Sequence, residues 1–158
     1  MKARKLNNQA FTIVEIVIVL LIIGVLTTII VMTYSGIQEK NRNSIRHNDL
    51  QQIQAKLEGF DSDNGYYPSL ADMNNPAWRQ KNLPGLNPKY MIDPSSKQTV
   101  NNVVLSATPK AGYYSYQVTD SNGNPCEKDD TNCAKYTLTA IYQGSYDGRH
   151  EYQLQNLD

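Results

Sequence analysis

Residues 11–32 read FTIVEIVIVLLIIGVLTTIIVM, an almost unbroken apolar block whose one charged residue is Glu15. A helix of this length extends about 33 Å, enough to cross the roughly 30 Å hydrocarbon layer of a bilayer. The ten preceding residues carry Lys2, Arg4 and Lys5 and no acid, which predicts a cytoplasmic N-terminus with the rest of the chain outside. The block is longer than the apolar core of an ordinary secretory signal, so we expect a membrane-spanning helix.

The remaining chain is polar and carries little sign of catalysis. Mean hydropathy over all 158 residues is −0.53, although 40% of them are apolar, and the formal net charge is zero. This length allows one domain besides the apolar block, and this charge argues against a basic nucleic-acid-binding domain. No G-x-S-x-G, H-E-x-x-H or P-loop pattern is present. His47 and His150 are expected to be solvated, so we predict a protein that is not an enzyme.

Glu15 is unfavourable where it stands, one turn inside an apolar span. A carboxylate at mid-bilayer costs about 2.5 to 3.5 kcal/mol, and less near the interface. The side chain either reaches the headgroups or is favoured by the positive end of the helix. Alternatively, it is retained to pair with a cation when the helix leaves the lipid for a protein core. A new amino group at Phe11, made by cleavage after Ala10, would supply that cation.

The stretch AFTIVE at residues 10–15, after a short basic leader and before a long apolar helix, resembles the class III signal of type IV prepilins. The resemblance implies cleavage by prepilin peptidase between Ala10 and Phe11, and N-methylation of Phe11. It also implies that Glu15 pairs with the Phe11 amine of a neighbouring subunit. The chain departs from the family at Ala10, where a glycine is usual, and no proline interrupts its apolar helix, as one does in many pilins.

Thr12 and Gly24 are assigned to assembly together with Glu15. Gly24, Thr27 and Thr28 are small enough to let helices approach closely. The resemblance further implies the partners: identical pilin subunits, prepilin peptidase, and an assembly platform with its ATPase. It places the chain in the cytoplasmic membrane before assembly and in an extracellular filament afterwards.

Helical spacing continues beyond the apolar block. Apolar residues recur mostly at intervals of three, four or eight among polar ones, which is typical of an amphipathic helix. They are Ile37, Ile45, Leu50, Ile53, Leu57 and Phe60. Gly59 and the polar residues after it predict the end of the helix near Phe60. We therefore expect a leader at 1–10, a helix at 11–60 about 75 Å long whose part 11–32 spans the membrane or forms the filament core, and a head at 61–158.

The head is predicted to be a small sheet packed on the helix. Prolines between residues 66 and 96 exclude a long helix there, while Ser69 is expected to cap one helical turn and Trp78 to pack on the core. Period-two patterns predict antiparallel strands at 113–119, 135–142 and 149–154, a weaker strand at 100–105, and a hairpin turn at 144–148. The expected fold class is α+β, the type IV pilin fold with three to four strands.

The loop expected at 120–134 contains both cysteines, Cys126 and Cys133. In an exported protein a disulfide is the natural interpretation, because metal or redox chemistry lacks the C-x-x-C spacing and nearby histidines. The loop is also rich in oxygen ligands around a glycine, which weakly indicates calcium; the alternative is an Asx-type turn in a solvated loop. The candidate ligands are Asp120, Asn122, Glu127 and Asp129. No other cofactor is expected.

The resemblance implies a structural subunit of a type IV pilus that serves surface adhesion and twitching motility. The alternatives are a secretion pseudopilin or minor pilin and, from another class, a monomeric membrane-anchored receptor or adhesin. Removal of Lys2, Arg4 and Lys5 with the leader would leave 12 basic and 15 acidic residues, a net charge of −3. We therefore expect no specific nucleic-acid binding.

Overall fold

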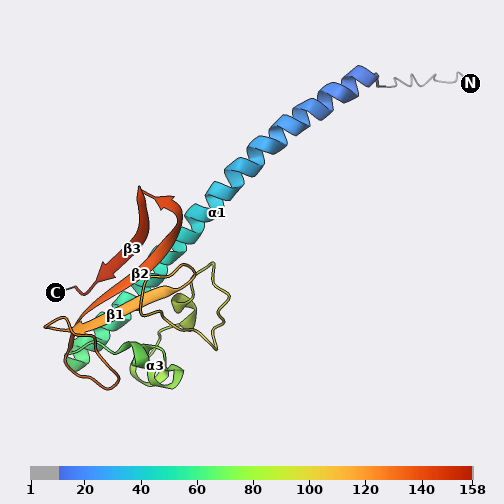
Figure 1. Ribbon diagram of the computed structural model, residues 1–158. Helices are drawn as coiled ribbons and strands as arrows, with labels where there is room; N and C mark the ends of the chain where they lie inside the picture. Colours follow the sequence, from blue (N-terminus) through green and yellow to red (C-terminus); the bar gives the residue numbers. More distant parts are fainter. Residues whose placement is uncertain (1–10, 158) are drawn as a thin grey trace, which may run out of the picture. The chain divides into compact units, whose positions relative to one another are not determined.

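The computed structural model describes residues 11–157 and contains four helical segments and three strands within them (Figure 1). In chain order these are α1 (Ile13–Asn64), α2 (Leu70–Met73), α3 (Pro76–Asn82), the 3-10 helix η1 (Pro88–Met91), β1 (Tyr114–Asp120), β2 (Cys133–Tyr146) and β3 (Arg149–Gln155). The chain divides after Gln38 into two compact units, so that the first 26 residues of α1 belong to one unit and the remainder of α1 to the other.

Within the first unit, the helix Ile13–Ile30 exposes apolar side chains along its whole length. The 18 residues Ile13–Ile30 have a mean hydropathy of 3.0 and none of them is buried, so this helix is long and apolar enough to cross a membrane. Its hydroxyl groups are satisfied internally: Thr27 Oγ1 donates to the Ile23 carbonyl at 2.7 Å, and Thr28 Oγ1 donates to the Gly24 carbonyl at 2.9 Å. The threonines therefore add no unpaired hydroxyl to an apolar surface.

The end of α1 lies one turn beyond the expected position. The helix continues through Gly59 to Asn64 and ends at Gly65, whose φ of +80° is accessible to glycine at little cost. The Asn64 side chain and the Gly65 N–H cap the last carbonyls, at 2.8 Å from the Phe60 oxygen and 2.6 Å from the Asp61 oxygen. Glycine within a helix costs only about 1 kcal/mol, which the buried Phe60 beside it offsets.

The sheet is antiparallel with strand order β1-β2-β3, and the three stronger strand predictions are confirmed. β2 is longer at both ends than expected, and the turn is tighter. Tyr146 pairs with Arg149, and the two residues between them, Asp147 and Gly148, have φ of 51° and 75°. Positive φ at both central positions is the type I′ pattern that suits the twist of a hairpin. Gly144 lies inside β2, at an irregularity in its pairing with β3.

The strand predicted at 100–105 is wrong. Val103 and Leu105 are buried, as the pattern suggested, but the segment is not assigned to a strand. The Asn74 side chain takes the place of a neighbouring strand, because its Oδ1 accepts from the Leu105 N–H at 2.7 Å and its Nδ2 donates to the Leu105 carbonyl at 3.1 Å. Among the described residues the sheet therefore has three strands.

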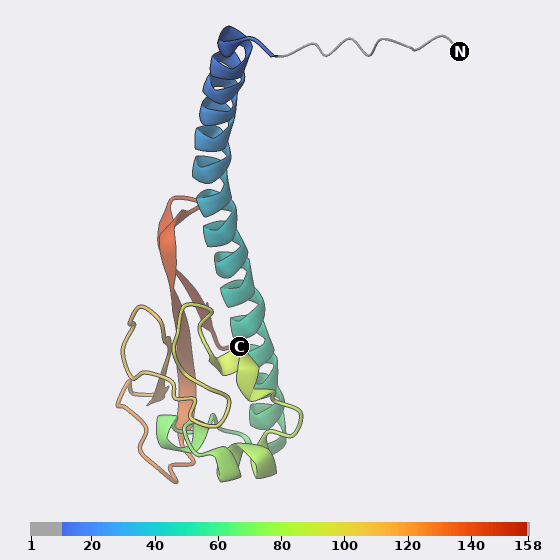
Figure 2. The same cartoon turned by 90° about the vertical axis from the view of Figure 1, so that its right-hand side faces the viewer.

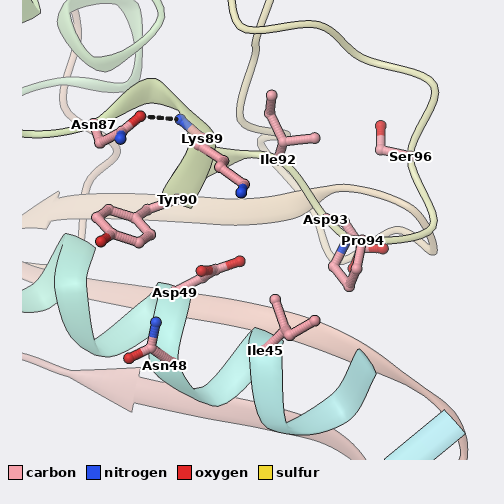
Figure 3. Close-up of a pocket in the computed structure, with 10 residues that line it drawn as sticks. All are labelled: Ile45, Asn48, Asp49, Asn87, Lys89, Tyr90, Ile92, Asp93, Pro94 and Ser96. Carbon is pink, nitrogen blue, oxygen red and sulfur yellow. Dashed lines mark hydrogen bonds between the residues drawn. The ribbon is translucent and has the colours of Figure 1, made fainter. Parts of the chain in front are cut away.

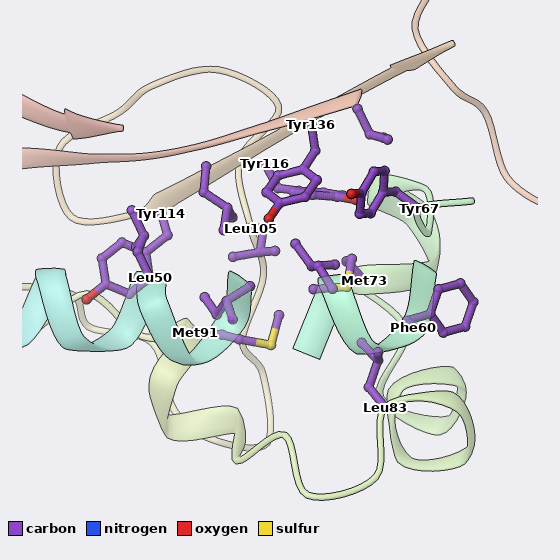
Figure 4. Packing of buried hydrophobic residues seen from close by; sticks show 14 of the residues in the cluster. Leu50, Phe60, Tyr67, Met73, Leu83, Met91, Leu105, Tyr114, Tyr116 and Tyr136 are labelled. Carbon is purple, nitrogen blue, oxygen red and sulfur yellow. The ribbon is translucent and has the colours of Figure 1, made fainter. Parts of the chain in front are cut away.

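The core of the second unit lies between α1 and the sheet. Residues 39–64 of α1 run beside the strands in both views (Figures 1 and 2), and their apolar face packs on Tyr114 and Tyr116 of β1 (Figure 4). The buried apolar residues of α1 are Leu50, Ile53, Leu57 and Phe60. Trp78 packs against this cluster with its ring 5.4 Å from that of Phe60, and Ser69 caps α2 through a capping box with Asp72, as predicted.

The buried face of α1 also differs from the apolar stripe expected from the sequence. Ile37 and Ile45 are exposed, whereas the polar residues Asn43, Arg46 and Asp49 are buried. The helical face is continuous, since these three residues stand three apart and lead into the apolar part of the core. The first two turns of this buried face therefore place charged and amide side chains in the interior, where the sequence pattern predicted apolar ones.

Candidate functional site

Thr12 and Glu15 form a reciprocal cap at the start of α1. The Thr12 N–H and Oγ1 both donate to Glu15 Oε2 at 2.9 Å, and the Glu15 N–H donates to Thr12 Oγ1 at 3.2 Å. This is the capping-box arrangement, which satisfies donors that a helix start otherwise leaves unpaired. The sequence signal was available, because threonine followed three residues later by glutamate is the pattern of such a box.

The cap places Glu15 beside the predicted processing site. Phe11 immediately precedes Thr12 and is 80% exposed. Ala10 lies outside the described residues, so cleavage between Ala10 and Phe11 and methylation of Phe11 stay predictions. Any amine created at Phe11 would be one residue from the threonine that holds the Glu15 carboxylate.

Gly24 lies at an open apolar groove on the helix surface. Its neighbours there are Val17, Leu20, Leu21, Val25 and Thr28. A Cβ at Gly24 would have no described heavy atom within 4 Å apart from its local helix surroundings, so nothing in the first unit exploits the small size of this residue. The space is available for another apolar helix, and the role of Gly24 in assembly stays a prediction.

The structure joins Cys126 and Cys133 in a disulfide, with their Cα atoms 5.9 Å apart. Cys133 is buried at the first position of β2, and its carbonyl accepts from the Tyr67 N–H at 2.9 Å. The bridge thus ties the loop between β1 and β2 to the segment that follows α1.

Of the four calcium candidates, Asp120 is the last residue of β1 and the other three lie in the loop that follows, where the structure shows a hydrogen-bonded turn. The Asp120 carboxylate accepts from the N–H groups of Asn122 and Asn124 at 2.8 Å each and from Asn124 Nδ2 at 2.9 Å. These bonds, the Asn124 side chain first, lower the pKa of Asp120. Glu127 and Asp129 are exposed. Within residues 11–157, no group of three or more His, Cys, Asp or Glu side chains could hold a metal ion.

A buried polar network on α1 was missed by the sequence analysis. Arg46 donates from Nε to Asp93 Oδ2 at 2.6 Å and from Nη2 to Asp93 Oδ1 at 2.9 Å, and its Nη1 donates to Asn43 Oδ1 at 2.6 Å. Burial raises the pKa of Asp93, but the hydrogen bonds from Arg46 and Ser95 outweigh it and lower the pKa overall. Spacing of three along the buried face was the signal that could have identified Asn43 and Arg46.

Asp49 belongs to the same face but has a different partner. Its Oδ2 accepts from the Tyr114 hydroxyl at 2.8 Å, and the side chain of Asp49 is almost completely buried. Burial is the main cause that raises the pKa of Asp49 to about 6. Burial, with the nearby Asp49, also holds the pKa of Tyr114 far above its usual value, so the hydroxyl remains the donor.

His47 is not solvated as expected. Its ring stacks on that of Tyr152, with centroids 3.8 Å apart and planes 8° apart, and it forms a hydrogen bond with the Tyr142 hydroxyl. Burial lowers the pKa of His47, and Asp147 acts in the opposite direction. The aromatic residues of β2 and β3 were predicted from strand alternation, but their contact with this helical histidine was not.

Comparison with known proteins matches a sequence motif within the first unit. Residues 5–31 match a family model described as the prokaryotic N-terminal methylation motif. No curated protein and no solved structure gives a significant match to the chain. The matched segment contains Phe11, the capping pair and the whole apolar helix Ile13–Ile30, and the α+β layout of the chain matches the type IV pilin fold. The chain therefore carries the N-terminal signature of type IV prepilins and pseudopilins.

Proposed function

We propose that this chain is a structural subunit of a type IV pilus filament. Before assembly it is anchored in the cytoplasmic membrane through residues 11–32; after cleavage and methylation at Phe11 it enters the filament through the same segment. The observation that carries the proposal is the helix Ile13–Ile30, which lies within the methylation motif and has no buried residue. A structural role as a polymer subunit fits a surface of this kind better than catalysis does.

The apolar helix must be surrounded by lipid or by other apolar helices before, during and after assembly. If a neighbouring helix bundle removes about 1,000 Å² of its surface from contact with water, the gross gain is roughly 25 kcal/mol at 25 cal/mol per Å². A water-exposed intermediate would therefore be strongly disfavoured. The subunit passes directly from lipid to neighbouring subunits, and the specificity of that transfer comes from packing and polar contacts, because lipid chains are as apolar as the helix.

Glu15 supplies the polar contact. In the single chain its carboxylate is held by the Thr12 N–H and hydroxyl, which are neutral donors. A charged amine at Phe11 of a neighbouring subunit would form a stronger, charge-assisted bond in the same low-dielectric surroundings. Assembly thus exchanges a contact within one subunit for a contact between two subunits.

The test compares Glu15→Leu with Glu127→Leu, a change at an exposed glutamate outside the motif. Membrane insertion is measured by fractionation and filament formation by shearing the cell surface. We expect Glu15→Leu to insert normally and to yield few or no filaments, and Glu127→Leu to assemble as the unaltered chain does. Wild-type filament yield from Glu15→Leu would overturn the proposal.

Mass spectrometry of the mature N-terminus provides an independent test. A subunit of a pilus is expected to begin with methylated Phe11, whereas a monomeric membrane-anchored receptor or adhesin would retain Met1 and remain functional with Glu15→Leu. A second candidate within the family is a secretion pseudopilin, because prepilins and pseudopilins share the matched signature. Loss of surface filaments, adhesion and twitching motility on deletion of the gene favours the pilus; loss of protein secretion alone favours the pseudopilin.

A further inference from the structure

A pocket of about 610 Å³ opens between α1 and the segment at 87–96 (Figure 3). Asp49 lies on the α1 side of the pocket and is 5% exposed. The exposed surface of the wall is mainly apolar and comes from Ile45, Tyr90, Ile92 and Pro94, and the polar side chains of Asn48, Asn87 and Ser96 complete the lining together with Lys89 and Asp93. A concave, mainly apolar site with a buried ionisable group is the usual form of a small-ligand site.

The two acids of the pocket differ in charge balance. Asp93 is neutralised from inside the chain, because both of its oxygens accept from Arg46. Asp49 accepts from the neutral Tyr114 hydroxyl, and in the described part of the chain no Lys, Arg or His nitrogen lies within the 4.0 Å of an ion pair with its carboxylate. The pocket therefore holds one carboxylate whose charge has no counter-charge in contact.

We propose that this pocket binds an alkylammonium group at the end of an apolar stem, the chemistry of a lysine side chain, with the ammonium at Asp49. A single carboxylate matches a monovalent cation. The apolar wall favours an organic stem over a hydrated metal ion, and the Tyr90 ring offers a second, weaker contact for the cation. Every residue in the inference belongs to the second compact unit, so the inference uses none of the residues on which the proposed function rests.

Lys89 is the one basic residue of the pocket lining, and its positive charge opposes the proposed ligand. Lys89 is exposed, and its charge is one of the smaller influences on Asp49, acting to lower the pKa of that acid. Replacing Lys89 with methionine would keep the apolar stem and remove the competing charge. The proposal therefore requires opposite effects from the two substitutions: Asp49→Asn must weaken binding, and Lys89→Met must strengthen it.

Protonation of Asp49 gives a third requirement. Burial raises its pKa to about 6; the hydrogen bonds from Tyr114 and Asn48 lower it, Asp93 raises it and Lys89 lowers it. An acid with this pKa is about nine-tenths protonated at pH 5 and almost fully ionised at pH 8. Because only the ionised form attracts the ammonium, affinity should be about tenfold weaker at pH 5 than at pH 8.

The experiment uses the full chain in detergent micelles and N-acetyl-lysine-N-methylamide as the probe. Binding is followed by NMR through the methyl groups of Ile45 and Ile92. We expect saturable shifts at pH 8, at least tenfold weaker affinity for Asp49→Asn, and tighter affinity for Lys89→Met. Asp129→Asn, an exposed acid in the loop that contains the disulfide, should leave the affinity unchanged. The capped norleucine analogue, which has the stem but no ammonium, should not bind.

Asp49→Asn retains an oxygen that can accept from Tyr114, so loss of binding by a folded variant reports on charge. Butylammonium distinguishes the source of the ligand: tighter binding of the capped lysine indicates a lysine on a polypeptide, and equal binding indicates a free amine. Equal affinity of the unaltered chain and Asp49→Asn would overturn the proposal, as would weaker binding by Lys89→Met or binding of norleucine as strong as that of lysine.

Discussion

Replacement of Asp49 by asparagine should stabilise the head, and by an amount that depends on pH. Asp49 is buried beside Tyr114, and its pKa rises from an ordinary 3.8 to about 6 in the folded protein. Well below pH 3.8 the acid is protonated in both states and its burial carries no penalty for charge. As pH rises from 4 to 8 the unfolded chain loses this proton first, so the free energy of unfolding falls.

The size of the effect follows from the pKa change. A rise from 3.8 to about 6 corresponds to at most about 3 kcal/mol at pH 8. Because relaxation of the surroundings reduces the penalty of a buried charge, we expect roughly 2 kcal/mol. Asparagine is nearly the same shape and still accepts from Tyr114, so it should match the protonated acid. Asp49→Asn is therefore expected to be close to neutral at pH 4 and stabilising by roughly 2 kcal/mol at pH 8.

The assay is denaturant unfolding of the full chain in detergent micelles at several values between pH 4 and pH 8. Fluorescence of Trp78, the one tryptophan in the sequence, reports on the core because its ring packs against Phe60. Asp129→Asn, at an exposed acid, serves as the control and should change stability little at any pH. A stability difference between Asp49→Asn and the unaltered chain that stays constant with pH, or that becomes destabilising at pH 8, would refute the reasoning.

The same unfolding assay tests four other changes. Arg46→Met should destabilise the head by about 3 to 5 kcal/mol, because it leaves a buried aspartate without its counter-charge. Gly148→Ala should cost about 1 to 2 kcal/mol, since its φ of 75° is unfavourable for a residue with a Cβ. Gly59→Ala should instead stabilise by up to about 1 kcal/mol, because that helical position is exposed and has room for a methyl group. Joint replacement of Cys126 by serine and Cys133 by alanine should cost about 2.5 kcal/mol from the lost loop constraint, and a reducing agent should then leave the variant's stability unchanged.

Much of the fold could be predicted because its signals are local. The span at residues 13–30 is marked by hydropathy alone, and β1 and β3 by alternation of residues along each strand. The end of α1 was placed too early because Gly59 breaks a helix only when nothing compensates for it, and the burial of Phe60 does. The extra strand at 100–105 was predicted because a buried extended segment has the same pattern whether a strand or the Asn74 side chain pairs with it.

The sequence analysis identified one group of candidate residues and missed the other. Thr12 and Glu15 were selected because their spacing and surroundings form a contiguous motif. The Asp49 pocket and the buried polar network beside it were missed because the residues that meet there are distant in sequence: Arg46 and Asp93 are 47 positions apart, and Asp49 and Tyr114 are 65 apart. A polar residue on a helix looks solvated in the sequence until the position of its partner is known. Only the register of the buried face pointed to these side chains.

Asp93, Glu15 and Asp49 differ in the kind of donor that holds each carboxylate. Asp93 has its own buried arginine, so its charge is satisfied within the chain and its role is to join α1 to the segment at 87–96. Glu15 and Asp49 are held by hydroxyl groups, those of Thr12 and Tyr114, which satisfy hydrogen bonding without balancing charge.

A cation from another molecule can improve on a hydroxyl at either acid, whereas at Asp93 it would have to displace an internal ion pair. At pH 8 the buried charge of Asp49 lowers the stability of the head. An alkylammonium ligand that pairs with this charge would therefore stabilise the head. Binding should consequently lower the pKa of Asp49 and raise the resistance of the head to denaturant as the probe concentration increases.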